Sequence, residues 1–149
     1  MNNRLETIVD LKKYSIQNLN SQIIKELIKN CKSELDQYSC STIPNFILPK
    51  SLKIMNAELE KQIDGVYMSK ESINPYLNSK DEPSLEKDHP KRIFSKRDNG
   101  YLNSDLFEKD SEMKFLYEQE ELLKFVSACV GVSPIYRWAD PLACHAYNI

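Results

Sequence analysis

The stretch from Glu120 to Ile149, EELLKFVSACVGVSPIYRWADPLACHAYNI, decides the fold class that the sequence predicts. Its first part repeats apolar residues at helical spacing and ends at Gly131, a residue suited to the end of a helix. Its second part predicts strands over residues 135–149, interrupted by the turn Asp140-Pro141. A helix followed by strands predicts an α+β fold, in which helices cover the strands because two or three strands alone are not stable.

The composition of the chain is that of a globular protein. It has 149 residues, of which 41% are hydrophobic and 28% charged, and 20 Lys+Arg against 22 Asp+Glu give a net charge of −2. This balance gives no electrostatic reason to expect nucleic acid or an anionic membrane as a partner. There is no apolar run of about 18 residues and no secretory signal at Met1–Glu6, so we expect a cytoplasmic protein.

Upstream of Glu120, the spacing of apolar residues predicts a helical layer. Helices are expected over residues 21–36 and 49–64, and two helical pieces within residues 111–131. Ser21 and Ser111 are suited to cap helices, and Pro49 fits a first helical position, where its missing N–H costs nothing. Residues 1–20 have weak periodicity and predict an arm lying on the body.

Residues 64–103 have neither a helical nor a strand period. Pro75, Pro83 and Pro90 interrupt the stretch, and roughly 40 irregular residues are unusual inside a compact domain. The stretch is therefore expected to be a long loop. Its role stays open between a functional lid or binding loop and a surface insertion.

By motif alone, the chain does not contain a complete active site. Its two histidines, His89 and His145, begin no His-x-Asp or His-x-Glu motif, and its three glycines stand too far apart to form a phosphate-binding loop. Cys144 and His145 are neighbours on a predicted strand, so their side chains point to opposite faces and do not form a nucleophilic pair.

The four cysteines have no spacing typical of a zinc site. In a chain with no signal peptide, buried free thiols are the common state of such residues. A Cys31–Cys40 or a Cys129–Cys144 bridge remains the alternative.

The densest positive charge is Lys91-Arg92 together with Lys96-Arg97. A nucleic-acid contact is disfavoured by the overall charge balance. A solvated loop face and the capture of a small carboxylate, which suits the planar donors of arginine, both remain open.

Four elements of the chain resemble one enzyme family. They are Leu35-Asp36-x-x-x-Cys40 with Ile43-Pro44-x-Phe46, Tyr76-Leu77 running to Asp88-His89-Pro90-Lys91-Arg92, Leu116-Tyr117 followed by Leu122-Leu123-x-Phe125-Val126, and Pro134-Ile135-Tyr136-Arg137-Trp138-Ala139-Asp140-Pro141-Leu142. In this order they are similar to the N-terminal part of iron(II)/2-oxoglutarate-dependent oxygenases related to the free-amino-acid halogenases and hydroxylases. In that family a segment like the fourth element follows a helix and opens a double-stranded β-helix, or jelly roll. The resemblance thus implies that residues 21–149 are the N-terminal portion of an oxygenase domain, truncated at the C-terminus.

The resemblance implies Fe(II) and 2-oxoglutarate as cofactors of the full-length protein. Family members hold iron with a His-x-Asp motif (His-x-Gly in the halogenases) and a distal histidine, and both would fall beyond Ile149. We therefore expect no metal ligands and no catalytic residues in this chain, which would be inactive alone. His89 and His145 do not match the ligand positions, and the arginine that binds 2-oxoglutarate is also expected downstream.

The resemblance further implies a substrate-binding set, which consists of Lys91, Arg92, Asp140 and Asn148. Lys91 and Arg92 match a basic pair that would hold the substrate carboxylate. Asp140 would face a cationic substrate group, with a plain turn role before Pro141 as the alternative. Asn148 matches a polar strand position at the mouth of the barrel.

The expected function is therefore that of a hydroxylase or halogenase fragment, whose substrate is a small molecule such as a free amino acid or its derivative. One alternative is a non-enzymatic helical interaction module that associates with a partner or itself through an unpaired strand edge. A second alternative is one half of a split oxygenase completed by another chain.

Overall fold

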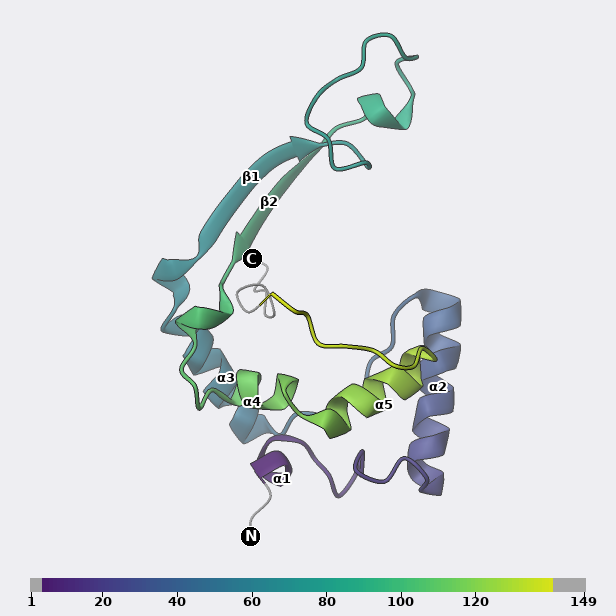
Figure 1. Ribbon diagram of the computed structural model, residues 1–149, viewed down its shortest axis with the longest axis vertical. Coiled ribbons are helices and arrows are strands. Elements are labelled where there is room, and N and C mark those ends of the chain that lie inside the picture. Colours follow the sequence, from purple (N-terminus) through teal and green to yellow (C-terminus); the bar gives the residue numbers. More distant parts are fainter. Residues whose placement is uncertain (1–3, 141–149) are drawn as a thin grey trace.

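The computed structural model describes residues 4–140 and consists of a helical base from which a long β-hairpin projects (Figure 1). In chain order the elements are α1 (Arg4–Ile8), α2 (Gln22–Tyr38), α3 (Pro49–Glu60), the 3₁₀ turn η1 (Ile63–Gly65), β1 (Tyr67–Ile73), η2 (Pro90–Arg92), β2 (Ser95–Tyr101), η3 (Ser104–Leu106), α4 (Glu112–Tyr117) and α5 (Glu120–Val130). We call residues 67–101 the arm, residues 74–94 its tip loop, and the other described residues the base. The predicted mixture of helix and strand is confirmed, and the sheet formed by the described residues is a two-stranded antiparallel one.

The longer helices begin where the sequence predicts, because local chemistry fixes their N-termini, whereas α2 extends to Tyr38 beyond the predicted 36 and α3 ends at Glu60 before the predicted 64. The side-chain oxygen of Ser21 accepts a hydrogen bond from the N–H of Ile24, and that of Ser111 accepts one from the N–H of Lys114. Pro49 is the first residue of α3. Gly131 follows α5 in the left-handed conformation, with φ of 74°, which glycine adopts without a side-chain clash.

The core of the base lies between the helices and the N-terminal segment. Its buried members are Leu5, Ile8, Val9, Tyr14, Ile16, Ile24, Cys31, Met55, Phe125 and Cys129. A run of aromatic rings crosses it, with ring centroids 5.8 Å apart for Tyr14 and Phe46 and 6.1 Å apart for Phe46 and Phe125. The rings of Phe46 and Phe125 are stacked, which packs the segment before α3 against α5.

Residues 1–20 were expected to lie on the surface of the body as an N-terminal extension. Half of the buried core residues nevertheless come from this segment. Leu5, Ile8 and Val9 are 0 to 1% exposed. Val9 forms a β-bridge with Ile47, and the hydroxyl of Tyr14 donates a hydrogen bond to the carbonyl of Pro44. The weak periodicity arises because the segment is one short helix followed by turns, each contributing separate apolar residues.

The arm corrects the expectation of an irregular loop over residues 64–103. Its strands pair in the register Tyr67↔Tyr101, with Lys70 opposite Asp98 and Glu71 opposite Arg97. These charge pairs favour the antiparallel register. Alternating apolar residues could not predict these strands. Both faces of the hairpin are largely exposed, so neither face requires apolar side chains.

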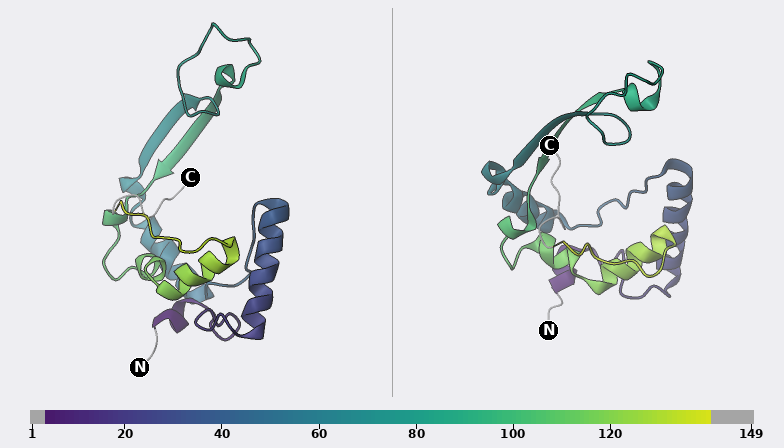
Figure 2. Two further views of the ribbon diagram at one scale, coloured as in Figure 1. Left: turned by 45° about the vertical axis from the view of Figure 1, so that its right-hand side comes forward. Right: turned by 45° about the horizontal axis from the view of Figure 1, so that its top comes forward.

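The segment after α5 differs from its prediction within the described residues. Residues 132–140 contain no strand, although one was expected from Ile135 to Ala139. The second predicted strand, from Leu142 onward, lies outside the described residues. Figures 1 and 2 show residues 132–140 (yellow) running back over α5 on the side of the base that faces the arm. Among residues 4–140, no helix has both the length and the apolar character needed to cross a membrane.

Candidate functional site

The tip loop of the arm is organised around one buried amide. Asn74 is 3% exposed, and its Oδ1 accepts hydrogen bonds from the N–H of Tyr76 (3.0 Å) and of Asn78 (3.1 Å). Its Nδ2 donates to the carbonyl of Lys91 at 2.7 Å. The start and the end of the loop are thereby joined by a single side chain, which holds the backbone of the predicted substrate-binding pair in place.

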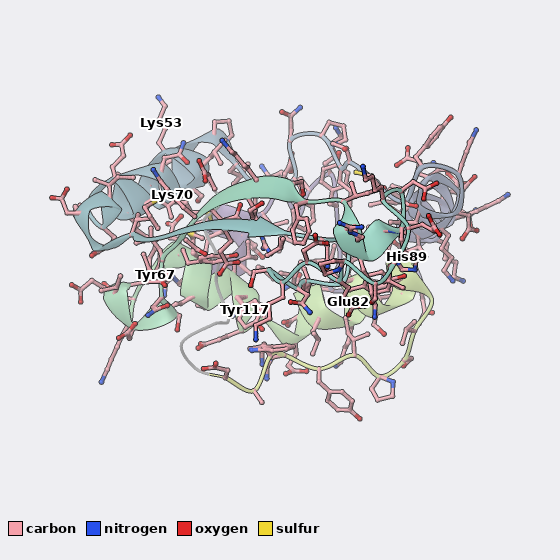
Figure 3. All side chains as sticks on the ribbon, turned by 90° about the horizontal axis from the view of Figure 1, so that it is seen from above. Lys53, Tyr67, Lys70, Glu82, His89 and Tyr117 are labelled. Carbon is pink, nitrogen blue, oxygen red and sulfur yellow. The ribbon has the colours of Figure 1, made fainter. Side chains whose placement is uncertain are left out.

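The motif Asp88-His89-Pro90-Lys91-Arg92 forms the 3₁₀ turn η2. Pro90 is its first residue, and Nδ1 of His89 accepts a hydrogen bond from the N–H of Lys91 at 3.2 Å. His89 is thus the cap of this turn, and it lies with Glu82 on the tip loop, seen from above in Figure 3. Its imidazole thus accepts a hydrogen bond from the local backbone, and the expectation that His89 is not an iron ligand stays a prediction.

Arg92 binds a carboxylate of the chain itself. Its Nε donates to Oδ1 of Asp81 at 2.9 Å, and its Nη2 donates to Oδ2 at 3.1 Å, a two-point contact that matches the planar guanidinium. Its Nη1 donates to the carbonyl of Leu85 at 3.0 Å. The hydrogen bond from Arg92 lowers the pKa of Asp81, and the same bond raises the pKa of Arg92.

Lys91 is paired in the same way. Its Nζ lies 3.2 Å and 3.3 Å from the two carboxylate oxygens of Glu82. Both members of the predicted basic pair therefore have the right chemistry for a carboxylate, and both already contact one. Asp81 and Glu82 were not predicted as partners of the basic pair, although two adjacent acidic residues in the same stretch as two adjacent basic residues were a usable signal.

The other half of the basic cluster lies on β2 and is separate from the tip. Arg97 stands opposite Glu71 in the hairpin, and its Nη2 donates to the hydroxyl of Tyr101 at 2.9 Å. The four basic residues thus belong to two elements, because Lys91 and Arg92 lie in the 3₁₀ turn η2 and Lys96 and Arg97 lie on β2.

The second region with predicted site residues is the segment 132–140, which follows α5. This segment contacts the junction between α4 and α5. Arg137 forms an ion pair with Glu120 at 2.8 Å and donates to the carbonyl of Glu118 at 3.2 Å. The N–H of Trp138 donates to the hydroxyl of Tyr117 at 2.8 Å. The aromatic side chains remain open to solvent, since Tyr136 is 82% and Trp138 67% exposed.

The predicted substrate-binding residues fall into two regions. Asp140 is exposed at the end of the described segment on the base, whereas η2 lies at the far end of the arm (Figures 1 and 2). The structure therefore does not bring Asp140 beside Lys91 or Arg92. Asn148 lies outside the described residues.

The residues from Arg4 to Asp140 do not fit an iron site. They include one histidine, His89, and no group of three or more His, Cys, Asp or Glu side chains placed to hold a metal ion. An iron site of this family requires two imidazoles with a carboxylate or halide. The expectation that the ligands lie beyond Ile149 stays a prediction, and no chemical step is assigned to iron in this chain.

Comparison with known proteins gives the chain no relative. No protein-family model matches it, and neither a curated protein nor a solved structure is significantly similar to it. The chain's own residues and fold are therefore the basis on which its function is proposed.

Proposed function

We propose that this chain is the N-terminal portion of an iron(II)/2-oxoglutarate-dependent oxygenase, a hydroxylase or halogenase of a small molecule such as a free amino acid. The observation that carries the proposal is the arrangement of residues 134–140, which belong to the fourth element of the resemblance. The segment leaves α5 at Gly131, is fixed to the helical base by Arg137 and Trp138, and has no strand partner among the described residues.

Such a segment is suited to be the opening strand of a larger sheet. Tyr136 and Trp138 present large apolar surfaces to solvent, and covering surfaces of this size is the main source of folding free energy. A sheet built onto residues 134–140 would cover these rings and would rest on the helical base. This is the order of elements that the resemblance implies, with a helix leading into a double-stranded β-helix.

The arm is proposed to act as a lid that carries the carboxylate ligand. Arg92 presents two parallel donors to Asp81, which is the geometry that a substrate carboxylate would need. Because Asp140 lies on the base, contact of one amino acid with both residues requires the arm to bend toward the base. A two-stranded hairpin exposed on both faces has few packing contacts that oppose such bending.

Iron(II) and 2-oxoglutarate belong to this proposal as cofactors of the complete enzyme, where together they would supply activated oxygen. Their ligands are proposed to come from chain downstream of Ile149. Lys91, Arg92, Asp140 and Asn148 would bind and orient the substrate.

The first experiment is to determine the coding sequence that follows the codon of Ile149. We expect an open frame that reaches a His-x-Asp or His-x-Gly motif and a later histidine. A frame that continues without such a motif would contradict the proposal, and an immediate stop codon would leave only the split-enzyme form of it. The 149-residue chain supplied with Fe(II) and 2-oxoglutarate is expected to form no succinate, and succinate formation would refute the downstream location of the ligands.

The second experiment uses the longer chain and measures succinate formed in the presence of free amino acids. Arg92→Gln is expected to raise the KM for the amino acid at least tenfold while the KM for 2-oxoglutarate stays unchanged. Arg97→Gln is the matched control, since it makes the same chemical change on the same arm away from the tip loop. Equal effects of the two substitutions would exclude Arg92 as the carboxylate ligand.

A second candidate function is an interaction module, and the outer edges of the hairpin favour it. Within residues 4–140, neither edge pairs with a further strand, and Tyr67 and Met68 are 69% and 44% exposed. Exposed edges of this kind pair readily with another chain. Light scattering over a range of concentrations tests this function: metal-independent self-association would support it, and a monomer at every concentration would speak against self-pairing.

A further inference from the structure

A cavity lies in the base between α2, α5 and the segment that follows α5. Its volume is about 670 Å³, within the range of about 300–1,000 Å³ that small-molecule sites occupy. Most of its lining side chains are apolar, and they are Leu19, Ile28, Leu123, Ala128, Pro134 and Ile135. None of its lining residues belongs to the set proposed to bind the oxygenase substrate, so this cavity is a separate site.

Two contacts hold the segment after α5 as one wall of this cavity. At the start of the segment, the hydroxyl of Ser127 donates a hydrogen bond to the carbonyl of Val132. Farther along, Arg137 forms its ion pair with the first residue of α5. The wall residues 133–135 lie between these two contacts, so the wall is anchored on both sides before any ligand binds, which lowers the cost of binding.

Three exposed charged side chains complete the lining, and their net charge is positive. They are Lys32 on α2 and Glu120 and Lys124 on α5. The carboxylate of Glu120 is already paired with Arg137 at 2.8 Å. Among residues 4–140, by contrast, neither lysine forms an ion pair with a carboxylate. Two ammonium groups therefore stand beside an apolar cavity without a negative partner.

The ammonium group of Lys32 lies at the end of α5. A β-carbon built on Gly131 would lie 3.8 Å from Cε and 3.9 Å from Nζ of Lys32. Gly131 ends α5, and the partial negative charge of a helix C-terminus favours a cation there. Lys32 thus reaches from α2 to the part of the cavity that Gly131 lines, which places a positive charge at one end of the apolar lining.

We propose that this cavity binds a free fatty acid, with its alkyl chain against the apolar lining and its carboxylate at Lys32. Each methylene group that the lining covers is removed from water, which is favourable. Lys124 adds to the positive potential that attracts the carboxylate. An alkyl amine would meet like charges at the same place, and a small hydrophilic anion would leave the apolar lining uncovered.

Isothermal titration calorimetry of the 149-residue chain with octanoate, decanoate and dodecanoate, each below its micellar concentration, tests the proposal. We expect the Kd to fall about tenfold for each two added methylenes. Decylamine has the chain length of decanoate and the opposite charge, and it should bind about ten times more weakly. Equal Kd values for octanoate and dodecanoate, equal values for decanoate and decylamine, or no binding of any of the three acids would overturn the proposal.

Variants at the two ends of the site sharpen the test. Lys32→Glu is expected to raise the Kd for decanoate about tenfold. Lys25→Glu is the matched control, because it makes the same change at an exposed position of α2 that does not line the cavity. Ile135→Asp places a carboxylate in the wall, outside the core cluster, and should remove the dependence on chain length.

Circular dichroism of each variant checks that its helices are retained. Equal effects of Lys32→Glu and Lys25→Glu would show a general attraction of anions by α2 and would overturn the proposal. A dependence on chain length that persists in Ile135→Asp would overturn it as well, because the alkyl chain would then lie elsewhere.

Discussion

The base and the arm are ordered by different physical means. In the base, side chains from α1, α2, α3 and α5 bury one another, and the stacked rings of Phe46 and Phe125 lie among them. In the arm, both faces of the hairpin are largely open to water, and the tip loop is held by the polar contacts of Asn74 and Arg92. Burial gives a cooperative unit, whereas hydrogen bonds at the surface give a local one, so we expect the arm to open without the base.

The largest expected effect comes from a cavity in the base. Phe125→Ala removes a ring that is 2% exposed and stacked on Phe46, and we expect a loss of about 3–5 kcal/mol in the free energy of unfolding. Tyr67→Ala, the control on the arm, removes a ring that is 69% exposed and should change that free energy by less than about 0.5 kcal/mol. Urea unfolding followed by circular dichroism measures both, and similar losses would mean that the arm shares the core.

The next effect should be confined to the arm. Asn74→Ala removes the amide that joins Tyr76, Asn78 and Lys91, and we expect the local opening free energy of the tip loop to fall by about 1–3 kcal/mol. Amide hydrogen exchange measures it residue by residue. Protection in α2 and α5 should stay unchanged, and a matching loss there would show that tip and base unfold together.

A smaller effect is expected at the contact between α3 and α4. Ser111 is 2% exposed, accepts from the N–H of Lys114, and donates to Glu58 on α3 at 2.8 Å. Ser111→Ala removes the cap of α4 and should lower the free energy of unfolding by about 1 kcal/mol. The control is Ser21→Ala, which removes a cap without a contact to another helix and should cost less in the same urea titration.

The smallest effect is the pH dependence of the ion pair at the tip. Because Arg92 lowers the pKa of Asp81 in the folded chain, the pair contributes fully at neutral pH and loses its contribution as the pH falls through that lowered value, below about pH 4. NMR titration of the Asp81 carboxyl and the Arg92 side chain measures this loss. In Arg92→Gln the carboxyl should titrate at its ordinary pKa, and an unchanged titration would show that the pair does not form in solution.

The contrast between base and arm also explains which parts of the fold the sequence predicts. Ser21, Pro49, Ser111 and Gly131 act on their own neighbours, so the starts of α2, α3 and α4 and the end of α5 could be placed from the sequence alone. The hairpin could not, because its order depends on pairs such as Lys70 with Asp98, which are distant in sequence and form no apolar pattern.

The sequence predicted which kind of group the residues of the candidate site bind, but it did not predict which residues supply that group. The fork of Arg92 does bind a carboxylate, as its residue type suggests, but the carboxylate belongs to Asp81. Cys31 and Cys129 are buried free thiols, as the sequence predicts, whereas Cys40 is free and exposed. The residue type thus predicted the chemistry of the side chain, whereas the partner of that side chain depends on the tertiary fold.

The pairing of Arg92 with Asp81 has a consequence for any incoming acid. Asp81 is tethered to the loop that carries the guanidinium, and a tethered group competes at an effective concentration on the order of millimolar. A free carboxylate must exceed that concentration, or make additional contacts of its own, before it displaces the resident one. Arg92 would therefore not bind simple carboxylic acids at low concentration. It would bind molecules that contact the protein at a second point as well.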